Sequence, residues 1–322
     1  MVPLYISEIS TTRNRGSLGS LNQLTICVGI LLALLANVAV APTGAWRRLF
    51  GLAVAPGALL ALGMAAAPES PRWLASVGAH DEALRAGRAL WGAECAAELQ
   101  SPPDGREGKA QAAASGGGGG GGGGGSALTR TVALGGLLFL LQQFSGINAV
   151  VYFSSKVFRD AGVASETLAT LAVGALNVVG TVLAGSIIDR VRRKTLLCVS
   201  WGAMGAAMLG MAGLRTPAAA VAGTLLYIFA FACGVGPVPG LMVPEMNPSA
   251  TRGQAVSVAM GSHWVCNAVI GQAFLPAVDA YGLPGVYTFF GVVCFAGVAF
   301  VRLCVPETSG KSMEEIEKGL AV

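Results

Sequence analysis

The residues best suited to binding chemistry form one short segment, Gln142-Gln143-Phe144-Ser145-Gly146-Ile147-Asn148, inside an apolar stretch from about Thr131 to Tyr152. A stretch of that length spans a bilayer as one helix, and polar side chains there are costly unless they face other helices or a wet cavity. Amides donate and accept hydrogen bonds at once, so this cluster suits a neutral ligand covered in hydroxyls, above all a sugar. A role in joining helices to one another explains the amides equally well.

Further polar side chains lie within other apolar stretches: Gln23, Asn177, His263 and Asn267. His263 is the one clearly intramembrane ionisable side chain in the sequence, which makes it a functional candidate. A neutral, hydrogen-bonded core histidine is an equally good interpretation. A lone glutamine such as Gln23 contacts a neighbouring helix more often than a ligand.

A second unusual segment, Gly234-Val235-Gly236-Pro237-Val238-Pro239-Gly240, interrupts a stretch that would otherwise be one continuous span. Its prolines and glycines leave backbone groups unpaired, and such broken helices are tolerated where they line a cavity. The segment therefore predicts a break that flexes during transport, with a static kink as the alternative.

The composition identifies the class of protein. With 322 residues, 53% of them hydrophobic and 12% charged, and a mean hydropathy of +0.64, the chain is too apolar for a soluble domain. We therefore expect an all-α polytopic membrane protein. The seven cysteines show no paired or metal-type spacing, and the net charge of +4 is too modest to indicate a nucleic-acid partner. The sequence contains no nucleophile with a base, no paired carboxylates and no metal-type spacing. We therefore expect neither an enzyme nor a cofactor.

The apolar stretches divide the chain into five parts. A polar segment at 1–17 precedes two spans within 18–68, and a polar insert at 69–129 carries the glycine run Gly116 to Gly125, which we interpret as a flexible tether. About six spans occupy 130–305, and a tail follows at 306–322. About eight spans place both ends on one side. Most lysines and arginines fall on that side, which we predict to be cytoplasmic or the equivalent side of an organelle.

Four motifs occur in a specific order: Pro68-Glu69-Ser70-Pro71-Arg72, the amide segment, Gly236-Pro237-x-Pro239 and Pro306-Glu307-Thr308. In these motifs the chain resembles the sugar porter branch of the major facilitator superfamily, over nearly its whole length outside the glycine run. It is most similar to the plastidic glucose transporters, through the segment from Val2 to Ser10, His263-Trp264, and Glu314-Glu315-Ile316-Glu317.

The resemblance implies a carrier that binds a hexose, with glucose favoured, by neutral hydrogen bonding and moves it across a lipid membrane by alternating access. It also implies the plastid inner envelope as the location, with the plasma or vacuolar membrane as the alternative. The residues implied to bind sugar hydroxyls are Gln142, Gln143, Asn148 and Asn177, with Gln23, His263 and Asn267 in or beside the site. The residues implied to act in gating are Gly236, Pro237 and Pro239 at the break and a cytoplasmic charge network of Glu8, Arg15, Glu69, Arg72, Asp189, Arg193, Glu245 and Arg252.

Several positions depart from the family pattern. Gly240 stands where many hexose carriers have a tryptophan that stacks on the sugar, so we expect a wider pocket. Ala232 replaces a charged residue of the network, and Ser309 replaces a basic residue. Arg192 replaces the glycine of a tight turn, and we expect a side chain there to strain the turn.

The family has twelve spans in two six-helix halves, and Met1 matches a point just after the fourth span. We therefore expect a major facilitator fold that lacks its first four helices. Family members that couple sugar to protons use an acid on the first helix, so the sequence leaves proton coupling open, as it does the oligomeric state. The alternative function is a non-transporting sugar-binding membrane protein that acts as a sensor or modulates a full-length carrier.

Overall fold

The computed structural model describes residues 2–11, 15–40, 46–92, 95, 99, 124–188, 190–214, 216–247 and 249–309, and these residues form helices and turns without a β-strand. The chain divides into two compact units, Met1–Gly118 and Gly119–Val322. Residues 116–123 of the predicted tether lie outside the described residues, and the first helix of the second unit begins at Gly124.

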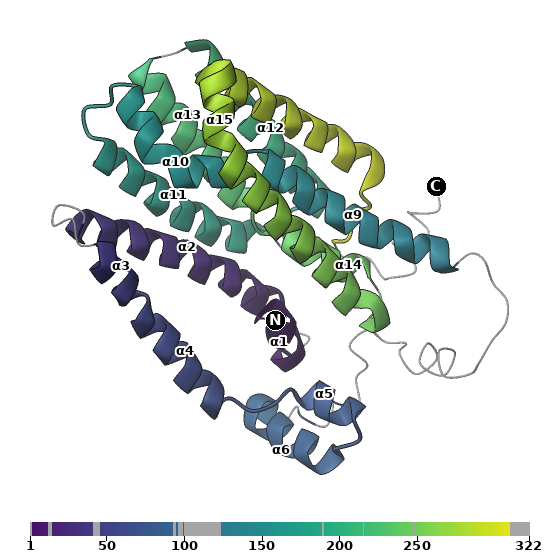
Figure 1. Cartoon of the computed structure of the whole chain (residues 1–322). Helices are drawn as coiled ribbons and strands as arrows, with labels where there is room; N and C mark the ends of the chain where they lie inside the picture. The colour runs from purple at the N-terminus through teal and green to yellow at the C-terminus, as the bar shows by residue number, and fades with distance from the viewer. Residues whose placement is uncertain are drawn as a thin grey trace. The chain divides into compact units, whose positions relative to one another are not determined.

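The first unit contains two membrane-length apolar stretches and a short polar helical pair. Its helices are α1 (Val2–Ile9), α2 (Arg15–Val40), α3 (Trp46–Leu52), α4 (Val54–Ala66), α5 (Pro71–Ser76) and α6 (His80–Trp91) (Figure 1). The apolar side chains of α4 are exposed, and none of its residues is buried. A helix that is apolar all round and exposed is suited to hydrocarbon.

The polar pair α5 and α6 is fastened to the rest of this unit by long-range hydrogen bonds. The indole Nε1 of Trp91 donates to the Ile9 carbonyl over 2.7 Å, and the Tyr5 hydroxyl donates to the Pro68 carbonyl over 2.7 Å. Ser70 caps α5 by accepting from the Trp73 N–H. The first part of the polar insert, which precedes the predicted tether, is thus helical.

The second unit is a bundle of longer helices, seen in teal to yellow in Figure 1. In chain order they are α9 (Gly124–Phe144), α10 (Ile147–Asp160), α11 (Glu166–Ile187), α12 (Arg193–Leu214), α13 (Pro217–Ala230), the π-helix η3 (Phe231–Val235), α14 (Val238–Met246) and α15 (Ser249–Cys304).

Helix α15 consists of two membrane-length helices that meet at a kink. At 56 residues it would be about 84 Å long if straight, which is far more than a bilayer requires. Gly282 interrupts it with φ 72° and ψ 159°, values that glycine adopts without strain, and the chain turns there. Seven described segments are long and apolar enough to cross a membrane, and counting α15 as two gives the eight that the sequence predicts.

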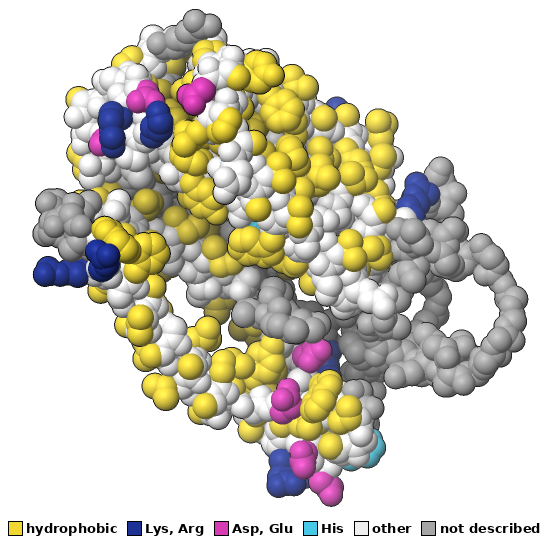
Figure 2. Space-filling view, viewed as in Figure 1, with side chains coloured by type: hydrophobic (Ala, Val, Ile, Leu, Met, Phe, Trp, Pro, Cys, Tyr) yellow, Lys and Arg dark blue, Asp and Glu magenta, His cyan; other side chains and the backbone are white. Residues whose placement is uncertain are grey.

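The core of the bundle forms where α15 packs against α9 and α12. Trp201 of α12 is fully buried, and a Cβ added at Gly297 of α15 would lie 2.8 Å from its ring. Small residues allow helices to approach closely in this way. Hydrophobic side chains cover much of the face in view in Figure 2, and charged ones gather at the end near the turn between α10 and α11.

Candidate substrate-binding site

The amide segment lies at a sharp break between two helices. Helix α9 ends at Phe144 and α10 begins at Ile147. Gly146 between them has a φ of 93°, in the left-handed region that favours glycine, and a Cβ added there would collide with the ring of Phe290. The sequence therefore breaks the span at this point, and Gln142 and Gln143 lie on one side of the break with Asn148 on the other.

Gln142 connects this break to the second broken segment. Its Nε2 donates to the Val235 carbonyl over 2.6 Å and lies 3.4 Å from the Gly236 carbonyl. In a regular helix the Val235 carbonyl would accept from residue 239, but Pro239 has no N–H. The glutamine supplies the missing donor. Its own Oε1 is buried and has no hydrogen-bond partner among the described residues.

Gln143 joins two of the other predicted site residues. Its Oε1 accepts a hydrogen bond from Asn148 Nδ2 across the break, and its Nε2 lies 2.5 Å from His263 Nδ1 on α15. The same Nε2 lies 3.1 Å from His263 Nε2, and the tautomer of the ring decides which ring nitrogen accepts. Gln143 itself is only 1% exposed. The structure thus brings Gln143, Asn148 and His263 together.

The structure places the three remaining predicted sugar ligands on α15, α11 and α2. Asn267 lies one turn after His263 on α15, and its Nδ2 is 3.4 Å from the Tyr152 hydroxyl. Asn177 is buried in the middle of α11. Gln23 belongs to the first unit, where its Nε2 lies 3.7 Å from Cys27 Sγ. The roles of Asn177, Asn267 and Gln23 in sugar binding stay predictions.

The predicted break around Gly236 and Pro237 is a π-helix followed by a turn. The Gly236 N–H donates to the Phe231 carbonyl over 2.8 Å, which closes the wide π turn. Ser200 of α12 holds the same element, because its Oγ donates to the Ala230 carbonyl over 2.6 Å and accepts from the Val235 N–H over 3.0 Å. Gly240 has open space where a side chain would project, and the wider pocket expected there stays a prediction.

A charge network lies at the N-terminus of α12. Arg193 Nη2 is 3.6 Å from the carboxylate of Glu245, which also accepts a 2.6 Å hydrogen bond from Thr308. The buried carboxylate of Glu307 accepts from the backbone N–H groups of Arg193 and Lys194, at 3.0 and 3.2 Å. A carboxylate at a helix N-terminus accepts hydrogen bonds from the free N–H groups and interacts favourably with the positive end of the helix dipole. Arg193 and Glu245 were predicted to meet, whereas Glu307 and Thr308 are additions from the structure.

Other members of the predicted network are described only in part. Asp189 and the side chains of Arg15 and Arg252 lie outside the described residues. Glu8, Glu69 and Arg72 belong to the first unit, where Glu69 accepts from the Ser70 N–H over 3.0 Å and the Arg72 guanidinium lies 5.8 Å from the centre of the Trp91 ring. Their latch role stays a prediction.

Arg192 forms an ion pair at the turn where its side chain was expected to cause strain. Its Nε is 3.6 Å from Glu307 Oε2. The side chain that replaces the family's glycine therefore gives Glu307 a further cationic contact. Because Arg192 is 74% exposed, this pair contributes at most a small amount to stability.

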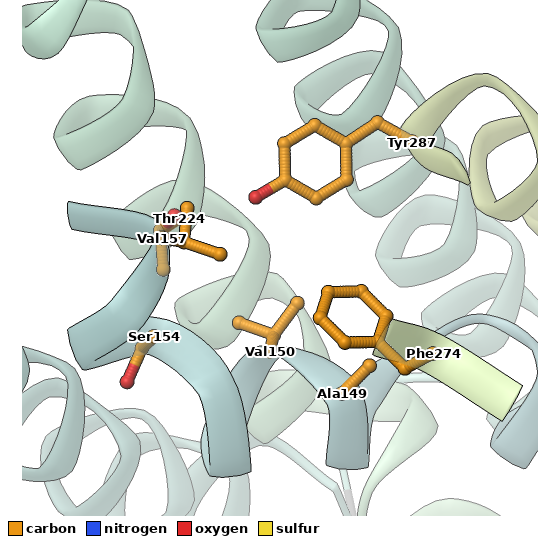
Figure 3. A pocket seen from close by; sticks show the side chains of 7 residues that line it. All are labelled: Ala149, Val150, Ser154, Val157, Thr224, Phe274 and Tyr287. Carbon is orange, nitrogen blue, oxygen red and sulfur yellow. The ribbon is translucent and has the colours of Figure 1, made fainter. Parts of the chain in front are cut away.

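A small cavity lies beyond Asn148, between α10, α13 and α15 (Figure 3). Its volume is about 10 Å³, and its lining residues are Ala149, Val150, Ser154, Val157, Thr224, Phe274 and Tyr287. The space is large enough for about one water and far too small for a hexose. The Tyr287 hydroxyl points into it.

Apolar spans, two helix breaks and buried amides beside those breaks define a polytopic helical membrane protein. The structure of the proton:xylose symporter XylE bound to 6-bromo-6-deoxy-D-glucose agrees with this: it matches 99% of this chain and 70% of its own length, with a TM-score of 0.83 and 28% identity. XylE is a protein of E. coli. The sequence profile described as "Sugar (and other) transporter" matches residues 1–320, and the chain belongs to this family.

The predicted similarity to plastidic transporters is also confirmed. Plastidic glucose transporter 4 of Arabidopsis thaliana is 45% identical over 329 residues, and probable plastidic glucose transporter 1 of the same plant is 40% identical over 330 residues. Both alignments cover 99% of this chain, and the chain spans 60% and 62% of the length of these relatives.

Proposed function

We propose that this chain is part of a carrier that moves a hexose, glucose first, across a membrane by alternating access, and that the amides at the α9–α10 break bind the sugar. Membership of the sugar transporter family and the names of the plastidic relatives support the substrate class. The same relatives support the plastid envelope as the membrane. The family consists of transporters, in keeping with a carrier without catalytic chemistry.

The observation that carries the proposal is the state of Gln142. Its Nε2 is fixed on the Val235 carbonyl, while its Oε1 is buried and unpaired among the described residues. Buried polar atoms without partners are rare, and each calls for an explanation such as a ligand. A sugar hydroxyl is a neutral donor, which is the kind of group that this acceptor lacks.

The neighbouring side chains make the site suitable for a molecule with several hydroxyls. Asn148 and His263 are both hydrogen-bonded to Gln143. A sugar hydroxyl that replaces one of these hydrogen bonds therefore lies close to further donors and acceptors. No acid of the described residues is bonded to His263. We therefore propose that His263 binds as a neutral group, and that any coupling to protons resides elsewhere in the protein.

The proposal also assigns an orientation. The network of Arg193, Glu245 and Glu307 lies at the cytoplasmic side or the equivalent side of an organelle, as the distribution of basic residues predicts. There it would hold α14 and the C-terminal segment against α12 when that side of the carrier is closed.

Equilibrium binding of labelled D-glucose to the purified protein in lipid nanodiscs tests the proposal, with L-glucose as the competitor that should not bind. Because Gln143 and Asn148 share a hydrogen bond, Gln143→Ala and Asn148→Ala should be coupled by about 0.5–3 kcal/mol in a double-mutant cycle. Gln272→Ala removes an exposed amide on α15 and is the matched control. Absence of saturable, stereospecific binding by the wild-type protein would refute the proposed site.

A further inference from the structure

We propose that Tyr227 is a positioning residue for the sugar-binding amides: its hydroxyl braces the α9–α10 break so that Gln143 and Asn148 converge. The inference rests on the proposed function, because it names a residue that acts on the same site without touching the ligand. Neither the family motifs nor the predicted site residues include Tyr227.

The contacts of the tyrosine are short and fully buried. From α13, Tyr227 Oη donates to the Ser145 backbone carbonyl over 2.9 Å and lies 3.2 Å from the Ser145 hydroxyl. The Ser145 hydroxyl in turn donates to the Gln142 carbonyl over 2.6 Å. Tyr227 and Ser145 are both 0% exposed. A buried phenol hydroxyl normally has such a partner, but here the partner is the helix break itself.

These side chains replace hydrogen bonds that the break removes. In a continuous helix the Gln142 carbonyl would accept from the Gly146 N–H, but that N–H donates to the Gln143 carbonyl over 3.0 Å. The Gln142 carbonyl is then satisfied by the hydroxyl of Ser145, and the Ser145 carbonyl by the hydroxyl of Tyr227. A buried carbonyl that loses its donor destabilises its conformation.

The direction of the break decides whether the amides meet. Gln143 is the second-last residue of α9, Asn148 is the second residue of α10, and a hydrogen bond joins their side chains across the break. Phe290 packs against Gly146 at the same break. Tyr227 is therefore the polar brace of the break and Phe290 the apolar one, and removing the hydroxyl alone should let the two amides separate.

Tyr227→Phe tests this with little change in volume, and Tyr287→Phe is the matched control. Tyr287 is also buried, at 5% exposure, and its hydroxyl points into the small cavity without a hydrogen bond to the described residues (Figure 3). Two quantities are measured in nanodiscs: amide hydrogen exchange of the peptide 141–150, and the Kd for D-glucose. Melting temperature is recorded as well, since a purely structural tyrosine would change it without changing the other two.

We expect Tyr227→Phe to speed exchange in this peptide and to raise the Kd about tenfold, as loss of one buried hydrogen bond predicts. Tyr287→Phe should change neither. Ser145→Ala keeps the hydrogen bond from Tyr227 to the backbone carbonyl but removes the donor to the Gln142 carbonyl. It should also speed exchange and raise the Kd, and it tests the hydroxyl chain at the break if Tyr227→Phe does not fold.

Exchange that stays at the wild-type rate in Tyr227→Phe would overturn the inference, and so would faster exchange with an unchanged Kd. If the wild-type protein binds no glucose, the proposed function fails by itself, and the exchange data still decide whether Tyr227 braces the break.

Discussion

Replacing Gln142 with alanine should weaken glucose binding while leaving membrane insertion intact. In the proposed site the unpaired Oε1 of Gln142 accepts a hydrogen bond from a sugar hydroxyl. The loss of such a buried hydrogen bond costs about 1–3 kcal/mol. That free energy corresponds to an increase in Kd of about 5- to 150-fold. Insertion should not change, because the substitution makes the span more apolar.

The same substitution has a second, separable effect on stability. Nε2 of Gln142 is the donor to the Val235 carbonyl, so its removal leaves that carbonyl unpaired and should lower the free energy of unfolding by about 1–3 kcal/mol. Alanine also leaves a cavity at a side chain that is only 3% exposed. Gln142→Met keeps the length and most of the volume, so it removes the hydrogen bonds without the cavity.

The assay is equilibrium binding of labelled D-glucose in nanodiscs, with melting temperature recorded for each variant. Gln142→Ala and Gln142→Met should lose similar amounts of affinity, and the alanine variant should lose more stability. Gln272→Ala, at an exposed position on α15, controls for the loss of an amide. If Gln142→Met binds glucose as tightly as the wild type does, the hydrogen bond from the sugar to Oε1 does not exist and the reasoning is wrong.

The remaining predictions concern the break, the histidine and the tether. Gly146→Ala should lower the free energy of unfolding by about 2 kcal/mol or more in chemical denaturation, through its positive φ and the collision with Phe290, whereas Gly202→Ala, which has open space, should not. His263→Asn should keep glucose affinity within about threefold between pH 5.5 and 7.5, because asparagine accepts the same hydrogen bond without an ionisable group; a steep pH dependence confined to the wild type would contradict the neutral role. Deleting residues 116–123 should leave the melting temperature and glucose affinity nearly unchanged, because loop length alters closure entropy only logarithmically, and a loss of expression would show that the run has a structural partner.

The helical framework could be read from the sequence because hydrocarbon permits few alternatives. Every backbone group within a span must be paired internally, so a long apolar stretch predicts a helix with few exceptions. The turn at Gly282 illustrates this: about six spans are expected after the tether, and α15 supplies two of them, one on each side of Gly282. The break at Gly146 lies within a stretch that the sequence presents as one span, and the structure adds it.

The partners of the site residues could not be read in this way. Gln143 and His263 are 120 positions apart, and nothing local in either segment indicates that they meet. Tyr227 reads as an ordinary apolar residue of its span, although a tyrosine at that depth does signal a hydroxyl that needs a partner. Glu307 belongs to a recognised motif, but its contact with the N-terminus of α12 depends on how the chain ends pack.

The need for one contact at the second break, though not the identity of its donor, follows from covalent chemistry alone. Proline at position 239 has no N–H, so the carbonyl four residues earlier, at Val235, needs a donor from another element. Within an apolar bundle the available donors are few, and an amide such as Gln142 can fill this need with one half of its side chain and keep the other half for a ligand. The hydrogen bond from Gln142 Nε2 to the Val235 carbonyl is that solution. The two interpretations of the amides, helix joining and sugar binding, are therefore compatible for Gln142. Its Nε2 joins the helices, and its Oε1 is left for the sugar.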